Sequence, residues 1–141
     1  PNAHKKEVFD KFWMNMDIHR NNAFSLTAME AAFNQGDEWL DQLLPYLSAN
    51  FDYVVDYCEK RIPKIKTYAP DATYLMWLDC RALGMSNEEL RDFFIHKAKL
   101  GLNEGYTFGR SLSGYMRLNA ACPRATLEKA MAQLKVAVDS L

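Results

Sequence analysis

The stretch Tyr115–Arg124 reads Tyr-Met-Arg-Leu-Asn-Ala-Ala-Cys-Pro-Arg and predicts a short buried strand that carries one arginine. Side chains alternate between the two faces of a strand, which here separates an apolar face from a polar one. The apolar face holds Met116, Leu118 and Ala120, and the polar face holds Tyr115, Arg117 and Asn119. The planar guanidinium of Arg117 suits a carboxylate held by two parallel hydrogen bonds; a solvated or salt-bridged structural arginine is the alternative.

A glycine-punctuated loop precedes this strand. Asn103–Gly109 reads Asn-Glu-Gly-Tyr-Thr-Phe-Gly, with two glycines and two aromatic residues. Glycine permits a positive φ angle or a close backbone approach to a ligand, so the rings of Tyr106 and Phe108 are candidates for the wall of a pocket. The alternative is that both rings plug the edge of the core.

Further strand signals lie upstream of that loop. Lys64–Tyr68 and Thr73–Leu78 are separated by Ala69–Ala72, whose proline and aspartate suit a turn, so the sequence predicts a hairpin. Thr73–Leu78 is apolar on both faces, which predicts a strand covered by helices on both sides. Lys99–Leu102 is expected to form another short strand.

Apolar residues at helical spacing predict five helices. They are Lys5–Met16, a short helix from Thr27 to about Asn34, a long helix over 37–62, a helix that starts at the capping box Ser86–Glu89, and a final helix after Pro123. Asp17–Phe24 is expected to be a loop, Thr27–Glu30 a second capping box, and Gly36 a left-handed helix end. Pro45 predicts a kink or a break in the long helix.

These elements predict a small mixed or antiparallel sheet with helices packed against it, an α/β fold that resembles a small α+β domain. The length of 141 residues and the 49% of hydrophobic residues fit one domain or a fragment of a larger protein. Seventeen basic residues balance 18 acidic ones, so neither nucleic acid nor a membrane surface is an expected partner. The sequence has no apolar run of membrane-spanning length, and its first residues lack the apolar core of a signal peptide, so we expect a cytoplasmic protein.

Neither a metal site nor a familiar catalytic motif is predicted. Cys58, Cys80 and Cys122 are too far apart for a zinc knuckle or a disulfide framework, so buried reduced thiols are expected. The three histidines show no pair spaced for a metal on one helical face. The sequence also shows no phosphate-cradling glycine loop, no nucleophile elbow and no pair of catalytic carboxylates that can be placed.

Three motifs, in this order, resemble the C-terminal part of class I/II aminotransferase-fold enzymes that use pyridoxal phosphate, most closely the cystathionine β-lyase (C-S lyase) branch. They are Thr73–Arg81, Asn103–Gly109 and Met116–Arg124. The resemblance implies the C-terminal domain of a fold type I enzyme. Residues 1–36 would be the tail of the large cofactor domain with connecting helices, 37–62 a long interdomain helix, and 63–141 the C-terminal small domain.

The resemblance also implies a role for Arg117, which would clamp the α-carboxylate of an amino-acid substrate. The possible pocket residues around it are Tyr74, Tyr106, Phe108, Gly109 and Asn119. Glu104 stands where many relatives carry proline, and Ala72 where many carry glycine.

The parent enzyme would be a homodimer that binds pyridoxal phosphate through a lysine in a Ser-x-Ser-Lys type motif. Because this sequence lacks that motif, the Schiff-base lysine is expected upstream, and the fragment alone is expected to be inactive and not to hold the cofactor. The resemblance does not separate a lyase from an aminotransferase. A non-catalytic regulatory or interaction module is the alternative, and an open reading frame that continues upstream into a cofactor domain would exclude it.

Overall fold

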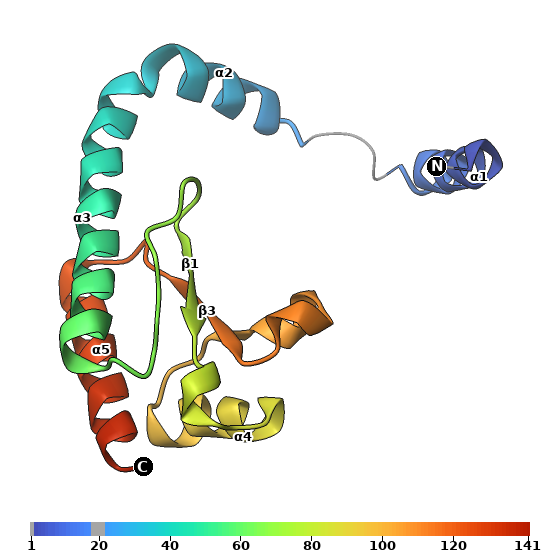
Figure 1. The fold of residues 1–141 in the computed structure, drawn as a ribbon. Helices are drawn as coiled ribbons and strands as arrows, with labels where there is room; N and C mark the ends of the chain where they lie inside the picture. The colour runs from blue at the N-terminus through green and yellow to red at the C-terminus, as the bar shows by residue number, and fades with distance from the viewer. Residues whose placement is uncertain (1, 18–21) are drawn as a thin grey trace. The chain divides into compact units, whose positions relative to one another are not determined.

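The structure is a computed structural model that describes residues 2–17 and 22–141. Figure 1 labels the five α-helices and the strands β1 and β3. In chain order the elements are α1 (Ala3–Met16), α2 (Ser25–Gln35), α3 (Asp37–Arg61), β1 (Leu75–Asp79), η1 (Arg81–Leu83), α4 (Asn87–Asp92), η2 (Phe93–Lys97), β2 (Asn103–Glu104), η3 (Gly105–Phe108), η4 (Arg110–Leu112), β3 (Tyr115–Asn119) and α5 (Arg124–Asp139). The chain divides into two compact units, Pro1–Gln42 and Leu43–Leu141.

The first unit consists of α1, α2 and the start of α3. The helix predicted over Lys5–Met16 begins slightly earlier, at Ala3, where the side chain of Asn2 accepts a hydrogen bond from the backbone N–H of Lys5. Part of the predicted loop Asp17–Phe24 lies outside the described residues. None of the described residues of this unit is buried.

Two predictions about α2 are wrong. The helix begins at Ser25, and the predicted capping box at Thr27–Glu30 is absent because Asn22 already fixes the helix start two residues earlier. The side chain of Asn22 accepts hydrogen bonds from the backbone N–H groups of Phe24 and Ser25, each at 3.0 Å. Gly36 is right-handed, with φ −89°, because α3 follows at once and the Gly36 carbonyl accepts a hydrogen bond from Leu40.

Of the kink or break predicted at Pro45, the break does not occur, since α3 is continuous from Asp37 to Arg61. Proline removes one backbone hydrogen bond, but packing of an apolar face stabilises a helix more than local preference does. The face that follows Pro45 is buried at Leu47, Asn50, Phe51, Val54 and Cys58.

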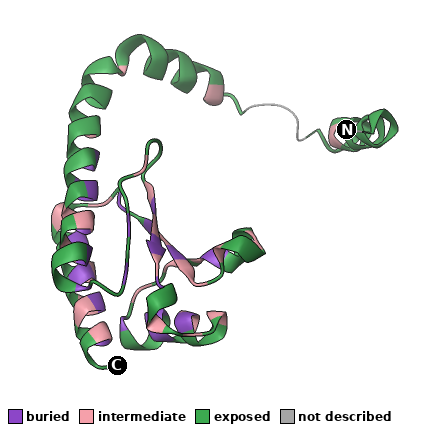
Figure 2. Cartoon of the chain, in the orientation of Figure 1, coloured by how far each residue is buried: buried purple, intermediate pink, exposed green. Residues whose placement is uncertain are grey.

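The second unit is built on a three-stranded antiparallel sheet with the strand order β1-β3-β2. One face of the sheet is buried, through Met76, Leu78, Met116 and Leu118. These side chains join one hydrophobic cluster with residues of α3, α4 and α5. Figure 2 colours the buried segments of these elements purple. The alternation predicted for β3 is confirmed, because Met116, Leu118 and Ala120 are all buried.

Three details of the predicted sheet are wrong. The hairpin is reduced to one isolated bridge between Lys66 and Asp79, and the strand partner of β1 is the distant strand β3. The strand expected at Lys99–Leu102 is replaced by β2 at Asn103–Glu104, since Lys99 adopts a left-handed conformation with φ +57° that interrupts an extended chain. Helices cover only one face of β1, and the opposite face is half-buried.

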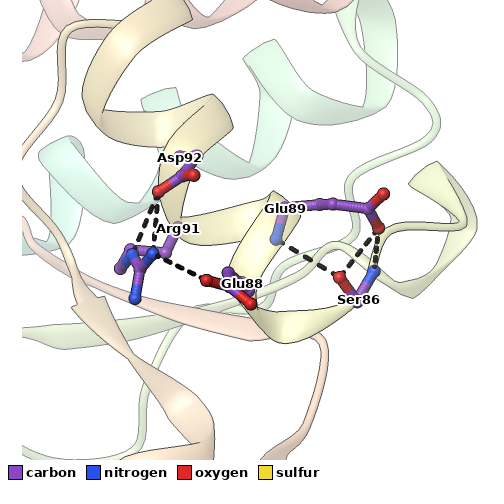
Figure 3. Close-up of polar contacts among 5 residues, drawn as sticks. All are labelled: Ser86, Glu88, Glu89, Arg91 and Asp92. Atoms are coloured by element: carbon purple, nitrogen blue, oxygen red, sulfur yellow. Dashed lines mark hydrogen bonds and ion pairs between the residues drawn. The ribbon is translucent and has the colours of Figure 1, made fainter.

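The capping box predicted at the start of α4 is confirmed. Figure 3 shows Ser86 and Glu89 exchanging hydrogen bonds, with the Glu89 carboxylate accepting from the Ser86 backbone N–H at 2.8 Å and the Ser86 hydroxyl accepting from the Glu89 N–H at 3.3 Å. The next turn, η2, buries Phe93 and Phe94. The final helix, α5, starts after Pro123 as predicted.

The fold class predicted from the sequence is confirmed: helices pack against a small antiparallel sheet. The cysteines are free, and burial raises the pKa of the Cys58 thiol to about 12 and that of Cys80 further still, while Cys122 is only half-buried. Among residues 2–17 and 22–141 no group of histidine, cysteine and carboxylate side chains is placed to hold a metal ion. No helix in the same ranges has the length and apolar character needed to cross a bilayer.

Candidate carboxylate-binding site

Arg117 lies at the middle of the central strand, on the face of the sheet that the helices do not bury. It is directly opposite Trp77 on β1 and directly opposite Asn103 on β2. Neighbouring strands hold such opposed residues close enough for their side chains to interact. The sheet register therefore determines which side chains flank the arginine.

The guanidinium of Arg117 is held by one neutral hydrogen bond and one aromatic ring. Its Nη2 donates to Oδ1 of Asn103 at 3.1 Å, and its Cζ lies 4.3 Å from the ring centroid of Phe108. The Phe108 ring in turn meets the ring of Trp77 edge-on, with centroids 5.7 Å apart and an interplanar angle of 80°. Arg117 thus sits on an aromatic surface that the sheet itself supports.

No carboxylate within the described part of the chain pairs with Arg117. Its Nε is buried and has no hydrogen-bond partner. A guanidinium that is partly withdrawn from water without an anionic partner is an unusual arrangement, because charged groups lose solvation on burial. The side chain therefore has the chemistry of an anion receptor that its own chain leaves without an anion.

A second arginine near the same face shows the contrast. Arg81 donates from Nε and Nη2 to the carboxylate of Asp79, at 2.9 and 2.7 Å, and lies over the ring of Tyr115. These hydrogen bonds from Arg81 hold the pKa of Asp79 below its ordinary value. Arg81 is an internally satisfied structural arginine, and Arg117 is not.

A tight approach of η3 to β3 positions Phe108. Gly105 is buried, and a Cβ atom added there would lie 2.5 Å from the carbonyl oxygen of Leu112 and 2.7 Å from that of Tyr115. Only glycine fits this contact, and Gly109, with φ +150°, ends the same turn in a conformation that side chains rarely adopt. The two glycines of the loop thus explain where the aromatic ring lies.

Of the predicted pocket residues, Phe108 contacts Arg117, and Gly109 directly follows Phe108. Tyr74 and Tyr106 are exposed, and the side chain of Asn119 accepts a hydrogen bond from the backbone N–H of Ala121 in its own turn. Their participation in a pocket stays a prediction.

Sequence reasoning missed two residues of the site, Asn103 and Trp77. Both lie opposite Arg117 because β3 pairs with β1 on one side and β2 on the other. The sequence pattern gave Trp77 a strand position and Asn103 a loop position, and no local signal paired either with Arg117. Strand pairing between distant segments was the information that was lacking.

The residues of this chain do not by themselves fit a cofactor that is anchored by a lysine. All ten lysines belong to the described residues; nine are exposed, and Lys135, which is half-buried, pairs with Asp139. A cofactor lysine needs an enclosed pocket with partners for the rest of the cofactor. None of these lysines lies in such an enclosed pocket, since nine are exposed and Lys135 is paired with Asp139.

Comparison with known proteins identifies relatives of this chain. No family model matches, but the chain is 37% identical over 138 residues to the cystathionine β-lyase PatB of Bacillus subtilis, covering 98% of this chain and 36% of that protein. It is 41% identical over 113 residues to the protein MalY of Escherichia coli, covering 80% of this chain and 29% of MalY.

Solved structures agree with these relatives. A pyridoxal-phosphate-bound putative aminotransferase from Clostridium difficile 630 superposes with a TM-score of 0.85 at 43% identity, over 98% of this chain and 36% of that one. Cystalysin from Treponema denticola, which contains pyridoxal 5'-phosphate, gives a TM-score of 0.85 at 29% identity, over 95% and 35%. The chain spans about a third of the length of the relatives it matches. The chain is therefore homologous to part of the cystathionine β-lyase branch of fold type I pyridoxal-phosphate enzymes, as its motifs predicted, and the partial coverage is consistent with a C-terminal part.

Proposed function

We propose that this chain is the C-terminal part of a pyridoxal-phosphate-dependent C-S lyase of the cystathionine β-lyase type, or of an aminotransferase, that acts on amino acids. The observation that carries the proposal is Arg117, a half-buried arginine with no carboxylate partner in the described part of a chain that is homologous to C-S lyases. Its role would be to bind the α-carboxylate of the substrate.

Each residue around Arg117 has a separable task in this proposal. The guanidinium supplies two parallel donors to the substrate carboxylate, which fixes the orientation of the amino acid. The Phe108 ring covers one face of the guanidinium and excludes water there, which strengthens the electrostatic attraction. When bound in the complete enzyme, pyridoxal phosphate would act as the electron sink for the reaction.

The domain assignment follows the same proposal. Residues 1–36 would end the large cofactor domain, 37–62 would form the interdomain helix, and 63–141 the small domain. The complete enzyme would be a cytoplasmic homodimer, and the chain on its own would be inactive because the lysine anchor lies outside it.

The test is Arg117→Lys in the complete enzyme. Lysine keeps the positive charge but holds a carboxylate through a single flexible contact, so the orientation of the substrate suffers. Loss of a charge-assisted hydrogen bond costs on the order of 1.5–3 kcal/mol, which predicts a roughly tenfold to hundredfold fall in kcat/KM. Steady-state kinetics with an α-amino acid and with an analogue that lacks the carboxylate would measure the effect.

The matched control is Arg110→Lys, because Arg110 is exposed on η4. Arg117→Lys should preserve the cofactor spectrum and should scarcely affect the analogue without a carboxylate, and the control should change neither substrate. Unchanged kinetics of Arg117→Lys with carboxylate-bearing substrates would mean that Arg117 is a structural residue and would refute the proposal.

A further inference from the structure

We infer that Asn103 and Phe108 are positioning residues that set the position and the free edge of the Arg117 guanidinium before a carboxylate arrives. The inference rests on the proposed function of Arg117, and it extends that function to two side chains that fix how the arginine presents its donors. Both contacts are direct: Nη2 donates a hydrogen bond of 3.1 Å to Asn103, and Cζ lies over the Phe108 ring, 4.3 Å from its centroid.

The first step concerns the position of the guanidinium. A free arginine side chain samples many rotamers, and side-chain entropy opposes holding it in one. The Phe108 ring, whose centroid lies 4.3 Å from Cζ, limits the positions that the guanidinium can take. The ring is itself restrained by its edge-on contact with Trp77 and by the glycine-limited turn that starts at Gly105.

The second step concerns the direction in which the guanidinium presents its donors. Asn103 Oδ1 accepts one of the Nη2 hydrogens, which fixes the direction of the guanidinium fork. The Nε atom on the other side of the group is buried, so the ends of the fork, Nη1 and Nη2, remain as the donors for an incoming anion. A carboxylate would therefore meet a receptor whose geometry is already set.

The third step concerns the chemistry of residue 103, where an amide and a carboxylate would act in opposite ways. Asp79 shows the effect of a carboxylate nearby, because it takes up two donors of Arg81 and leaves that arginine satisfied. Asn103 orients Arg117 through an oxygen of similar reach without cancelling its charge. An aspartate at this position would compete with the substrate for the same guanidinium.

The exposure of Asn103 argues against a purely structural role. Its side chain is exposed on a two-residue edge strand, where a neutral hydrogen bond contributes little to folding. Phe108 is also half-exposed, with 49% of its surface accessible, although phenylalanine is a residue type usually found inside. Both exposed side chains contact the same arginine, Arg117.

The experiment uses the complete enzyme and the ratio of kcat/KM for an α-amino acid to kcat/KM for its carboxamide. Asn103→Ala and Phe108→Leu should lower this ratio by about threefold to tenfold, mainly through KM. Asn103→Asp should lower it further, by at least about tenfold, because its carboxylate occupies the guanidinium. Propionate serves as a simple competing carboxylate, and its inhibition constant should rise in the same order.

A merely structural role would reduce the amount of active enzyme and leave the ratio and the inhibition constant unchanged. Two controls match the changes: Ala132→Asp adds a negative charge on an exposed position of α5, and Tyr68→Leu removes an aromatic ring that is 77% exposed. Neither control should change the ratio.

The outcomes separate this inference from the proposed function. If Arg117→Lys lowers the ratio while Asn103→Asp and Phe108→Leu do not, the proposed function stands and the positioning role is overturned. If Arg117→Lys itself leaves the ratio unchanged, both are overturned. Should Phe108→Leu fail to fold, Asn103→Asp still decides the question, because it is isosteric and lies on an exposed position.

Discussion

Both units of this chain contain helices with an apolar face, but only the second unit buries those faces. In Leu43–Leu141 the apolar faces of α3 and α5 meet a sheet, and twenty hydrophobic residues are buried there. In the described part of Pro1–Gln42 no residue is buried, and large apolar side chains such as Phe24 and Phe33 are more than 80% exposed. An amphipathic pattern thus predicts which face of a helix is apolar, and only the fold decides whether that face has a partner.

The strongest test of this difference between the units replaces one phenylalanine in each unit by alanine. Phe94→Ala should lower the free energy of unfolding of the chain by about 3–5 kcal/mol, because Phe94 is fully buried and a cavity would remain. Phe33→Ala, at a residue that is 81% exposed, should change it by less than about 0.5 kcal/mol. Urea denaturation followed by circular dichroism measures both values. Equal effects would mean that the first unit has a core of its own.

Two asparagines, one in each unit, should differ less in how much their replacement changes the free energy of unfolding. Asn50 is fully buried on α3, where its amide donates to the carbonyl oxygens of Ala120 and Cys122 at 2.9 and 3.0 Å, and its oxygen accepts from Arg124 Nε at 2.9 Å. Asn50→Ala should cost about 1–3 kcal/mol, since it removes the amide that donates to the buried carbonyl of Ala120 and the oxygen that accepts from Arg124.

The matched substitution is Asn34→Ala, at an exposed position of α2, where the change in unfolding free energy should be close to zero. The same denaturation measurement compares the two variants. A neutral Asn50→Ala would show that the link between α3 and the segment after β3 does not stabilise the fold.

The exposed apolar side chains of the first unit should promote self-association of the chain and contribute little to its folding stability. Contiguous apolar surface on a soluble protein promotes self-association, so we expect the 141-residue chain to form oligomers or to be poorly soluble. Replacing Phe24, Phe33 and Trp39 by glutamate should shift the chain toward the monomer while scarcely changing its unfolding free energy. Light scattering across a concentration series measures the shift. A wild-type chain that is already a clean monomer at high concentration would contradict this expectation.

How much of the fold was predictable depended on whether the signal was local. Helical stripes, the Ser86–Glu89 capping box and the alternation along Tyr115–Asn119 are read within a few residues, and all three are confirmed. The partner of β1 was not predictable, because Trp77 pairs with Arg117 across forty residues of sequence, and the nearer candidate at Lys66 forms only a bridge. Pairing of distant strands depends on the whole core.

The candidate site also combines features with a local sequence signal and features without one. Alternation along β3 and the family motif both indicated Arg117, and the glycines around Phe108 indicated an aromatic turn. The contact between Asn103 and Arg117 was not predictable, because it follows from the register of an edge strand that is only two residues long. The site was therefore predictable where one residue carries it, and not where two strands must first be aligned.

The smallest expected effect compares two helix starts with the same sequence pattern, since Ser86–Glu89 forms a capping box and Thr27–Glu30 does not. Hydrogen bonds from the backbone N–H and the hydroxyl of Ser86 lower the pKa of Glu89 below its ordinary value of about 4.3. A carboxylate whose pKa is lower in the folded state stabilises the fold above its unfolded pKa, and this contribution is lost as the pH falls through the folded pKa. Glu89→Gln should therefore reduce stability at pH 7 and have little effect well below pH 4. Thermal melts of Glu89→Gln and of the wild-type chain between pH 3 and pH 7 measure this, and a pH-independent effect of Glu89→Gln would show that the charge of Glu89 plays no part in the cap.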